Sequence, residues 1–162
     1  MKIECTLSAA SISNAVEQLR KYADSLEKKT EKLVQSLGEF GTDSAANYVG
    51  HFDTGETLSS LTFTRNGTTA TIFVGGNAVW IEFGTGVVRN EGSGHPKKDD
   101  LGMSDWGTYG QGKGANPEGW WYPSEDGYTH TFGIKMNMFM YRSAQDMRKE
   151  LGRIAKEAFK DD

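Results

Sequence analysis

Apolar residues recur every three or four positions between residues 11 and 50, which is the period of an amphipathic α-helix. Ser11 or Ser13 could cap the first turn, and Gly38 or Gly41 could interrupt the helix. The pattern therefore predicts two helices, or one long kinked helix, over this segment.

The period changes to two from Thr57 onward, which is typical of a β-strand. Asn66 and Gly67 then form a hairpin turn signal, because both residue types accept a positive φ. A return strand follows, and residues 78–83 are read as a third strand. We therefore expect an antiparallel β-meander over residues 57–86.

Residues 87–133 are rich in glycine and aromatic side chains and have no steady period, so they predict a long loop insertion. A second helical stripe follows, and we expect a C-terminal helix over residues 137–160 with Asn137 as its cap. Before the first helix, residues 2–7 are read as a short leading strand that contains Cys5 as a small strand residue.

These elements predict an α+β fold made of a single domain, residues 1–162. N-terminal helices and a C-terminal helix are expected to pack on an antiparallel β-sheet, with the long loop insertion emerging from it. The stripe Met140, Met147, Leu151 and Ile154 is expected to face the sheet.

The charge balance argues against nucleic acid as the main ligand. The chain has 18 Lys and Arg against 22 Asp and Glu, a formal charge of -4, so it offers no basic footprint for a phosphate backbone. One cysteine excludes an intrachain disulfide, and the chain has no apolar run of membrane-spanning or signal-peptide length. We expect a protein without membrane contact.

Asp53-Thr54-Gly55 is the motif that most resembles catalytic chemistry, because aspartic proteases pair two such carboxylates on one proton. Glu56 follows directly and would crowd a dyad, and the flanking sequence is helical. A turn before a strand is the preferred interpretation, and an aspartic-type protease at Asp53 is the weaker one.

The sequence matches no metal-ligand, dinucleotide or phosphate-loop pattern, and we expect no cofactor, no metal and no enzymatic activity. The side chains that could in principle bind a metal are interpreted as solvated loop residues: His51, Asp53, His95, Asp99, Asp100 and His130.

The aromatic side chains of the insertion allow three interpretations: a protein interface, a carbohydrate-binding surface, or a satellite core that holds the loop. They are Trp106, Tyr109, Trp120, Trp121, Tyr122 and Tyr128.

Four stretches of the chain, from about residue 30 to the C-terminus, resemble the gene-product-ten-like family of phage tail-component and head-tail joining proteins. They are Asp53-Thr54-Gly55, the run from Ala78 to Gly86 (AVWIEFGTG), Gly119-Trp120-Trp121-Tyr122-Pro123 and Phe139-Met140-Tyr141.

The resemblance implies a structural virion protein that completes the tail or joins it to the head connector. It implies a homo-oligomeric ring, a hexamer or dodecamer, beside other neck proteins, with DNA passing through without sequence-specific binding. Assembly would occur in the host bacterial cytoplasm. The expected contact residues are Trp80, Glu82, Phe83, Gly84, Trp106, Trp120, Trp121 and Tyr122.

Within the second stretch, Glu82 precedes a glycine-rich turn, so its carboxylate is expected to accept backbone N–H groups there. Trp80 and Phe83 are expected on opposite sides of a strand, one in the core and one toward a neighbour.

Overall fold

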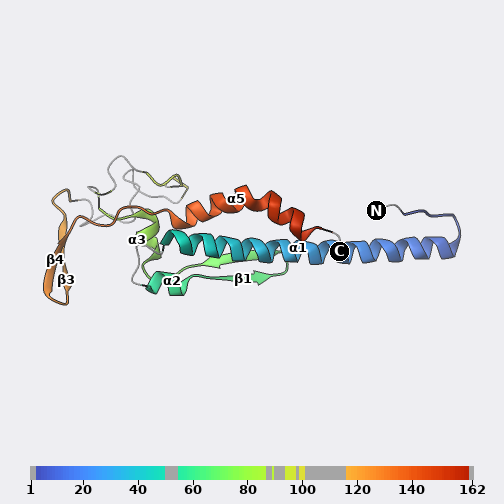
Figure 1. The fold of residues 1–162 in the computed structure, drawn as a ribbon, viewed down its shortest axis with the longest axis horizontal. Helices are drawn as coiled ribbons and strands as arrows, with labels where there is room; N and C mark the ends of the chain where they lie inside the picture. The colour runs from blue at the N-terminus through green and yellow to red at the C-terminus, as the bar shows by residue number, and fades with distance from the viewer. Residues whose placement is uncertain are drawn as a thin grey trace.

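The computed structural model describes residues 3–49, 55–86, 89, 94–97, 99–100 and 116–160. It has the α+β composition that the sequence predicts (Figure 1). No helix in these ranges is both long and apolar enough to cross a membrane. In chain order the elements are α1 (Ala9–Val49), α2 (Glu56–Ser60), β1 (Thr62–Asn66), β2 (Thr69–Phe73), α3 (Ala78–Phe83), β3 (Trp120–Ser124), β4 (Gly127–Thr131) and α5 (Phe139–Ala158).

α1 is a single helix of 41 residues. Ser8 caps it by accepting a hydrogen bond from the Ser11 N–H at 3.2 Å, so the prediction of Ser11 or Ser13 as the cap was wrong. Gly38 and Gly41 do not interrupt the helix. They are buried where Phe63 and Met147 come so close that a Cβ would collide with them.

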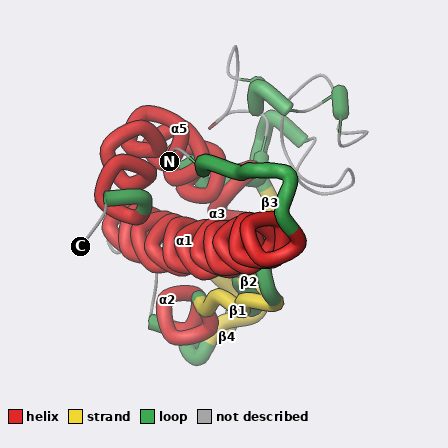
Figure 2. The backbone as a smooth tube through the Cα atoms, turned by 90° about the vertical axis from the view of Figure 1, so that its right-hand side faces the viewer, coloured by secondary structure: helices red, strands yellow, loops and turns green. Residues whose placement is uncertain are grey.

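α5 packs chiefly along the C-terminal half of α1, and the β1–β2 hairpin lies against another side of the same helix (Figure 2). The Ser143 hydroxyl donates to the Gly41 carbonyl at 2.6 Å across the helix pair. The expectation that α5 rests on a sheet was therefore wrong in its main contact. Leu151 is 44% exposed, so it does not belong to the buried stripe that Ile154 and Ala158 form.

A polar cluster joins the same two helices. Asp146 of α5 accepts hydrogen bonds from the Tyr48 hydroxyl at 2.8 Å, from the Ser44 hydroxyl at 3.1 Å and from the Lys149 ammonium at 3.1 Å. These donors, Tyr48 first, lower the pKa of Asp146, because each favours the ionised carboxylate.

The predicted meander is reduced to a two-stranded hairpin. β1 and β2 pair antiparallel, and the turn residues are Gly67 and Thr68, one position later than predicted. Residues 56–60 and 78–83 are short helices rather than strands. Both periods fit a run of six residues that are apolar except for Glu82, and packing decides. Ala78, Ile81 and Glu82, at helical spacing, are the buried positions of α3.

The described end of the insertion is more regular than the predicted loop, since β3 and β4 form a second antiparallel hairpin there. By contrast, residues 3–6 have no regular structure and Cys5 is exposed, so the leading strand is absent from the described part of the N-terminus. The hydrophobic core lies where α1, α3 and α5 meet, and contains Ala45, Val49, Leu61, Ala78, Ile81 and Phe139.

Candidate functional site

The Glu82 side chain caps a helix that begins 57 residues later in the chain. Its two carboxylate oxygens accept the N–H groups of Met140 at 2.8 Å and of Tyr141 at 3.0 Å, in the first turn of α5. The residue before the helix, Met138, has φ 58° and makes no side-chain cap. A carboxylate is favourable there because these N–H groups have no helical partner and the helix dipole is positive at that end.

Glu82 thus accepts backbone N–H groups as expected, but from α5 rather than from its own turn. Asn137, the predicted cap, is buried and donates its side-chain amide to the Tyr48 carbonyl at 3.0 Å. Asn137 is next to the start of α5 in the sequence, but the distant Glu82 caps the helix instead.

His95 completes the environment of Glu82. Its Nε2 lies 3.1 Å from Glu82 Oε1, and its Nδ1 accepts the Lys97 N–H at 3.1 Å. In a neutral ring, this acceptor role of Nδ1 puts the proton on Nε2, which then donates to the carboxylate. His95 is 3% exposed, so its interpretation as a solvated loop residue was wrong.

Aromatic rings enclose the imidazole. The Phe83 ring centroid lies 4.5 Å from that of His95 and the Tyr141 centroid 5.5 Å from it. The pair therefore links α3, the insertion and α5 at one point. The hydrogen bonds of Glu82 to Met140, Tyr141 and His95 hold these three segments together.

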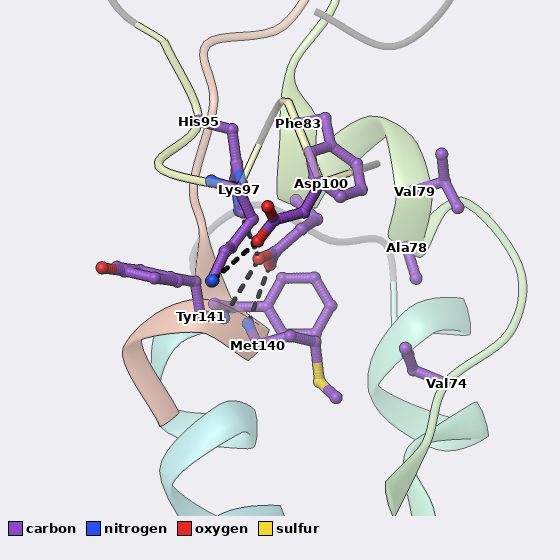
Figure 3. Close-up of a pocket in the computed structure, with 11 residues that line it drawn as sticks. Val74, Ala78, Val79, Phe83, His95, Lys97, Asp100, Met140 and Tyr141 are labelled. Carbon is purple, nitrogen blue, oxygen red and sulfur yellow. Dashed lines mark hydrogen bonds and ion pairs between the residues drawn. The ribbon is translucent and has the colours of Figure 1, made fainter. Parts of the chain in front are cut away.

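A mainly apolar cavity of about 460 Å³ adjoins this cap. Figure 3 shows Val79, Phe83 and Met140 around it, with Lys97 and Asp100 nearby. These last two form an exposed ion pair at 2.7 Å. Among the described residues that line it there is no serine or cysteine nucleophile.

The chain after the second hairpin runs alongside the end of α3. Thr85 and Ile134 exchange backbone hydrogen bonds at 2.8 and 3.0 Å. Gly86 and Gly133 have φ values of 82° and 93°, and a Cβ on either would collide with a backbone carbonyl of the other strand of chain. This contact between the two segments anchors the β3–β4 hairpin at its base.

The β3–β4 hairpin carries an aromatic face. Trp121 pairs across the ladder with His130, and Pro123 pairs with Tyr128, so all four side chains lie on one side. The Trp121 and His130 ring centroids are 5.0 Å apart and tilted by 58°. Trp121 is 60% exposed and Tyr128 is 72% exposed, so this face is open to solvent. We call Trp121, Pro123, Tyr128 and His130 the aromatic face.

The predicted contact residues fall into two groups. Glu82 caps α5 and Phe83 packs on His95, whereas Gly84 ends α3. Trp80 is partly exposed on α3 rather than on a strand. Trp120 and Tyr122 are on β3, on the side opposite to the aromatic face. Trp106 lies outside the described residues.

Sequence reasoning missed the role of His95, and it named Tyr128 among the aromatic residues of the insertion without placing it on a hairpin. The alternation of Trp121, Pro123, Tyr128 and His130 around the Glu125-Asp126-Gly127 turn could have indicated a hairpin with one aromatic side. Nothing local could have paired His95 with Glu82.

The other residues considered for catalysis or metal binding do not form a site in the described residues. His51 and Asp53 are outside the described residues, so the protease hypothesis falls on a part of the chain without a described structure. In the described ranges, no three His, Cys, Asp or Glu side chains gather in a way that could hold a metal ion.

Comparisons with protein-family models, with curated proteins and with solved structures found no match to this chain.

Proposed function

We propose that this chain is a non-catalytic structural subunit of a tailed bacteriophage, a head-tail joining or tail-completion protein of the neck that acts by ring assembly. The sequence stretches that resemble the gene-product-ten-like family support this role. In the proposed virion, copies of the chain surround the DNA passage and contact adjacent neck and tail proteins.

The observation that carries the proposal is the aromatic face. A two-stranded hairpin is marginally stable by itself, and here it exposes Trp121 and Tyr128 instead of burying them. Tryptophan and tyrosine are the side chains that most often anchor protein interfaces, because they bury a large area with few rotatable bonds. A neighbouring subunit or neck protein that covers this face explains both facts.

The chemistry around Glu82 supports an assembly role over a catalytic one. Its carboxylate already accepts two backbone N–H groups and contacts His95, so it has a structural task in the folded subunit. The same cap ties α3, which carries Trp80, to α5.

A carbohydrate-binding module is the alternative use of exposed aromatic rings. Flat sugar stacking favours rings in one plane, whereas Trp121 and His130 are tilted by 58° and His130 and Phe132 by 88°. This geometry suits interlocking protein side chains better.

The test replaces Trp121 and Tyr128 by alanine together. We expect the variant to fold, with an unchanged circular dichroism spectrum, and to lose ring-sized particles in native mass spectrometry with neck proteins. It should also fail to complete tails in a phage that lacks the wild-type chain. Phe73→Ala, which removes an aromatic side chain of similar exposure from β2, is the matched control.

Unchanged tail completion by the double variant would contradict the proposal. Quenching of tryptophan fluorescence by oligosaccharides, lost in the same variant, would favour the carbohydrate-binding module instead.

A further inference from the structure

The N-terminal segment Ile3–Leu7 has the pattern of a strand but no sheet to join. Ile3, Cys5 and Leu7 alternate with polar residues, the period of a half-buried strand. Neither described sheet includes the segment, and Leu7 is fully exposed. A sequence with strand character is thus left on the surface.

α1 holds this segment away from the rest of its own chain. Its N-terminal half extends beyond both α5 and the β1–β2 hairpin (Figure 1). At about 1.5 Å per residue, Ala9 lies roughly 42 Å along the helix from Leu37, whereas five extended residues span only about 17 Å. Ile3–Leu7 therefore cannot reach its own β2, which packs near Leu37.

β2, in turn, has one edge that pairs with no strand in the described residues. In the described residues the sheet contains only β1 and β2. Because antiparallel pairs alternate and Asn66 pairs with Thr69 around the turn, Ala70 and Ile72 direct their backbone groups away from β1. Such an edge is a template for another strand.

A groove of about 560 Å³ runs beside that edge. Thr68–Ile72 form one wall, Met140 and Met147 of α5 form another, and Leu37 contributes from α1. The groove is mainly apolar. It offers backbone groups along one side and apolar side chains along the other, which is what an added strand with one apolar face requires.

We propose that Ile3–Leu7 of one copy adds as a third strand to the β2 edge of a second copy. Both segments are five residues long, and the apolar face of Ile3, Cys5 and Leu7 enters the groove on the side of Ala70 and Ile72. The proposal rests on the ring assembly proposed above, and names where neighbouring copies join.

The N-terminal half of α1, which carries the segment, also favours a second copy of the chain as the partner. Ile12, Val16, Leu19 and Leu26 are exposed along one face of α1, an apolar stripe that a lone subunit leaves in water. A neighbour that receives the strand lies close enough to cover it. The contact is head to tail, so each copy donates one strand and accepts one, and repetition closes a ring or extends a chain.

Cys5, the only cysteine, allows a direct test in the full-length protein. A neighbour of Cys5 on the same side of an added strand is Ala70 or Ile72, so Ala70→Cys and Ile72→Cys are made separately and oxidised. We expect at least one to give a ladder of disulfide-linked dimers and larger species on a non-reducing gel. Combining it with Cys5→Ser should abolish the ladder.

Thr71→Cys is the matched control, because its side chain lies on the other side of β2. If neither Ala70→Cys nor Ile72→Cys links more than Thr71→Cys does, strand addition in this register is wrong. Circular dichroism establishes that each variant is folded before oxidation.

A second pair of variants separates this proposal from the proposed function. Leu7→Asp places a charge on the apolar face of the donor, and Thr6→Asp places it on the polar face. We expect the first to reduce ring-sized particles at least tenfold and the second to leave them unchanged. Rings that form equally in both would overturn strand addition and leave ring assembly standing. A wild-type chain that forms no rings and completes no tails would overturn the proposed function.

Discussion

The two halves of α1 have the same helical period but different surroundings. In the C-terminal half, Gly38, Gly41, Ala45 and Val49 are buried under α5 and the β1–β2 hairpin. In the N-terminal half the stripe positions are larger apolar residues, and they are exposed: Ile12, Val16, Leu19, Tyr22 and Leu26.

The two stripes also differ in residue size, since three of the four buried positions are glycine or alanine and every exposed one is valine or larger. Small residues allow a close approach, as at Gly41, where Met147 and Ile72 meet the helix backbone. Large residues fill the space to a more distant partner. The covered half thus makes its contacts within the chain, and the exposed half is where the proposed neighbouring copy would pack.

The largest effect is expected where α5 packs on the covered half of α1, at Phe139. This residue is fully buried against α1 and α3, so Phe139→Ala should lower the free energy of unfolding by about 3–5 kcal/mol. Urea denaturation measures this. Phe159→Ala, at the partly exposed end of α5, should have a much smaller effect; equal losses would mean that the core is not centred on Phe139.

The comparison can be tested with one substitution made twice in the same helix. Val49 is 0% exposed and Val16 is 42% exposed. Val49→Ala should cost about 1.5–3 kcal/mol from lost burial and the resulting cavity. Val16→Ala should be neutral or stabilising by a few tenths of a kcal/mol in the monomer, because alanine favours the helix. A similar loss at both sites would show that the isolated chain already covers the exposed half.

The cap at Glu82 determines whether α5 stays in place over the covered half. Glu82→Gln keeps the shape but turns one acceptor into a donor facing a backbone N–H, so we expect a loss of about 1–3 kcal/mol. Thermal unfolding of the variant measures it. Glu157→Gln, on the exposed face of α5, should change stability little; a neutral Glu82→Gln would contradict the capping role.

The smallest effect is a dependence on pH at the α1–α5 contact. Because its hydrogen bonds lower the pKa of Asp146, its carboxylate stabilises the folded state above the ordinary value of 3.8. That contribution is lost as the pH falls from 3.8 through the lowered pKa. Unfolding measured at pH 7 and pH 3 should therefore show a smaller acid-induced loss for Asp146→Asn than for the wild type. Equal losses would show that Asp146 contributes nothing to the pH dependence.

Much of the fold could be predicted from local pattern. The helix from residue 9 to 49, the turn near Gly67 and the helix from residue 139 to 158 follow from periods that persist over many residues. The predictions failed where the runs were short. The six residues at 78–83, five of them apolar, satisfy both periods, and the aromatic alternation at 120–131 was obscured by the glycines around it.

The sequence by itself determined the two long amphipathic helices, the α+β class and the acidic balance, because each depends on residue types and spacings along the chain. Only the tertiary structure decided that Glu82 caps α5 with His95 beside it, and that the segments at Gly86 and Gly133 lie side by side. The same holds for which half of α1 is covered. These are contacts between residues tens of positions apart, and which groups meet depends on how the elements pack rather than on the residues next to them in the chain.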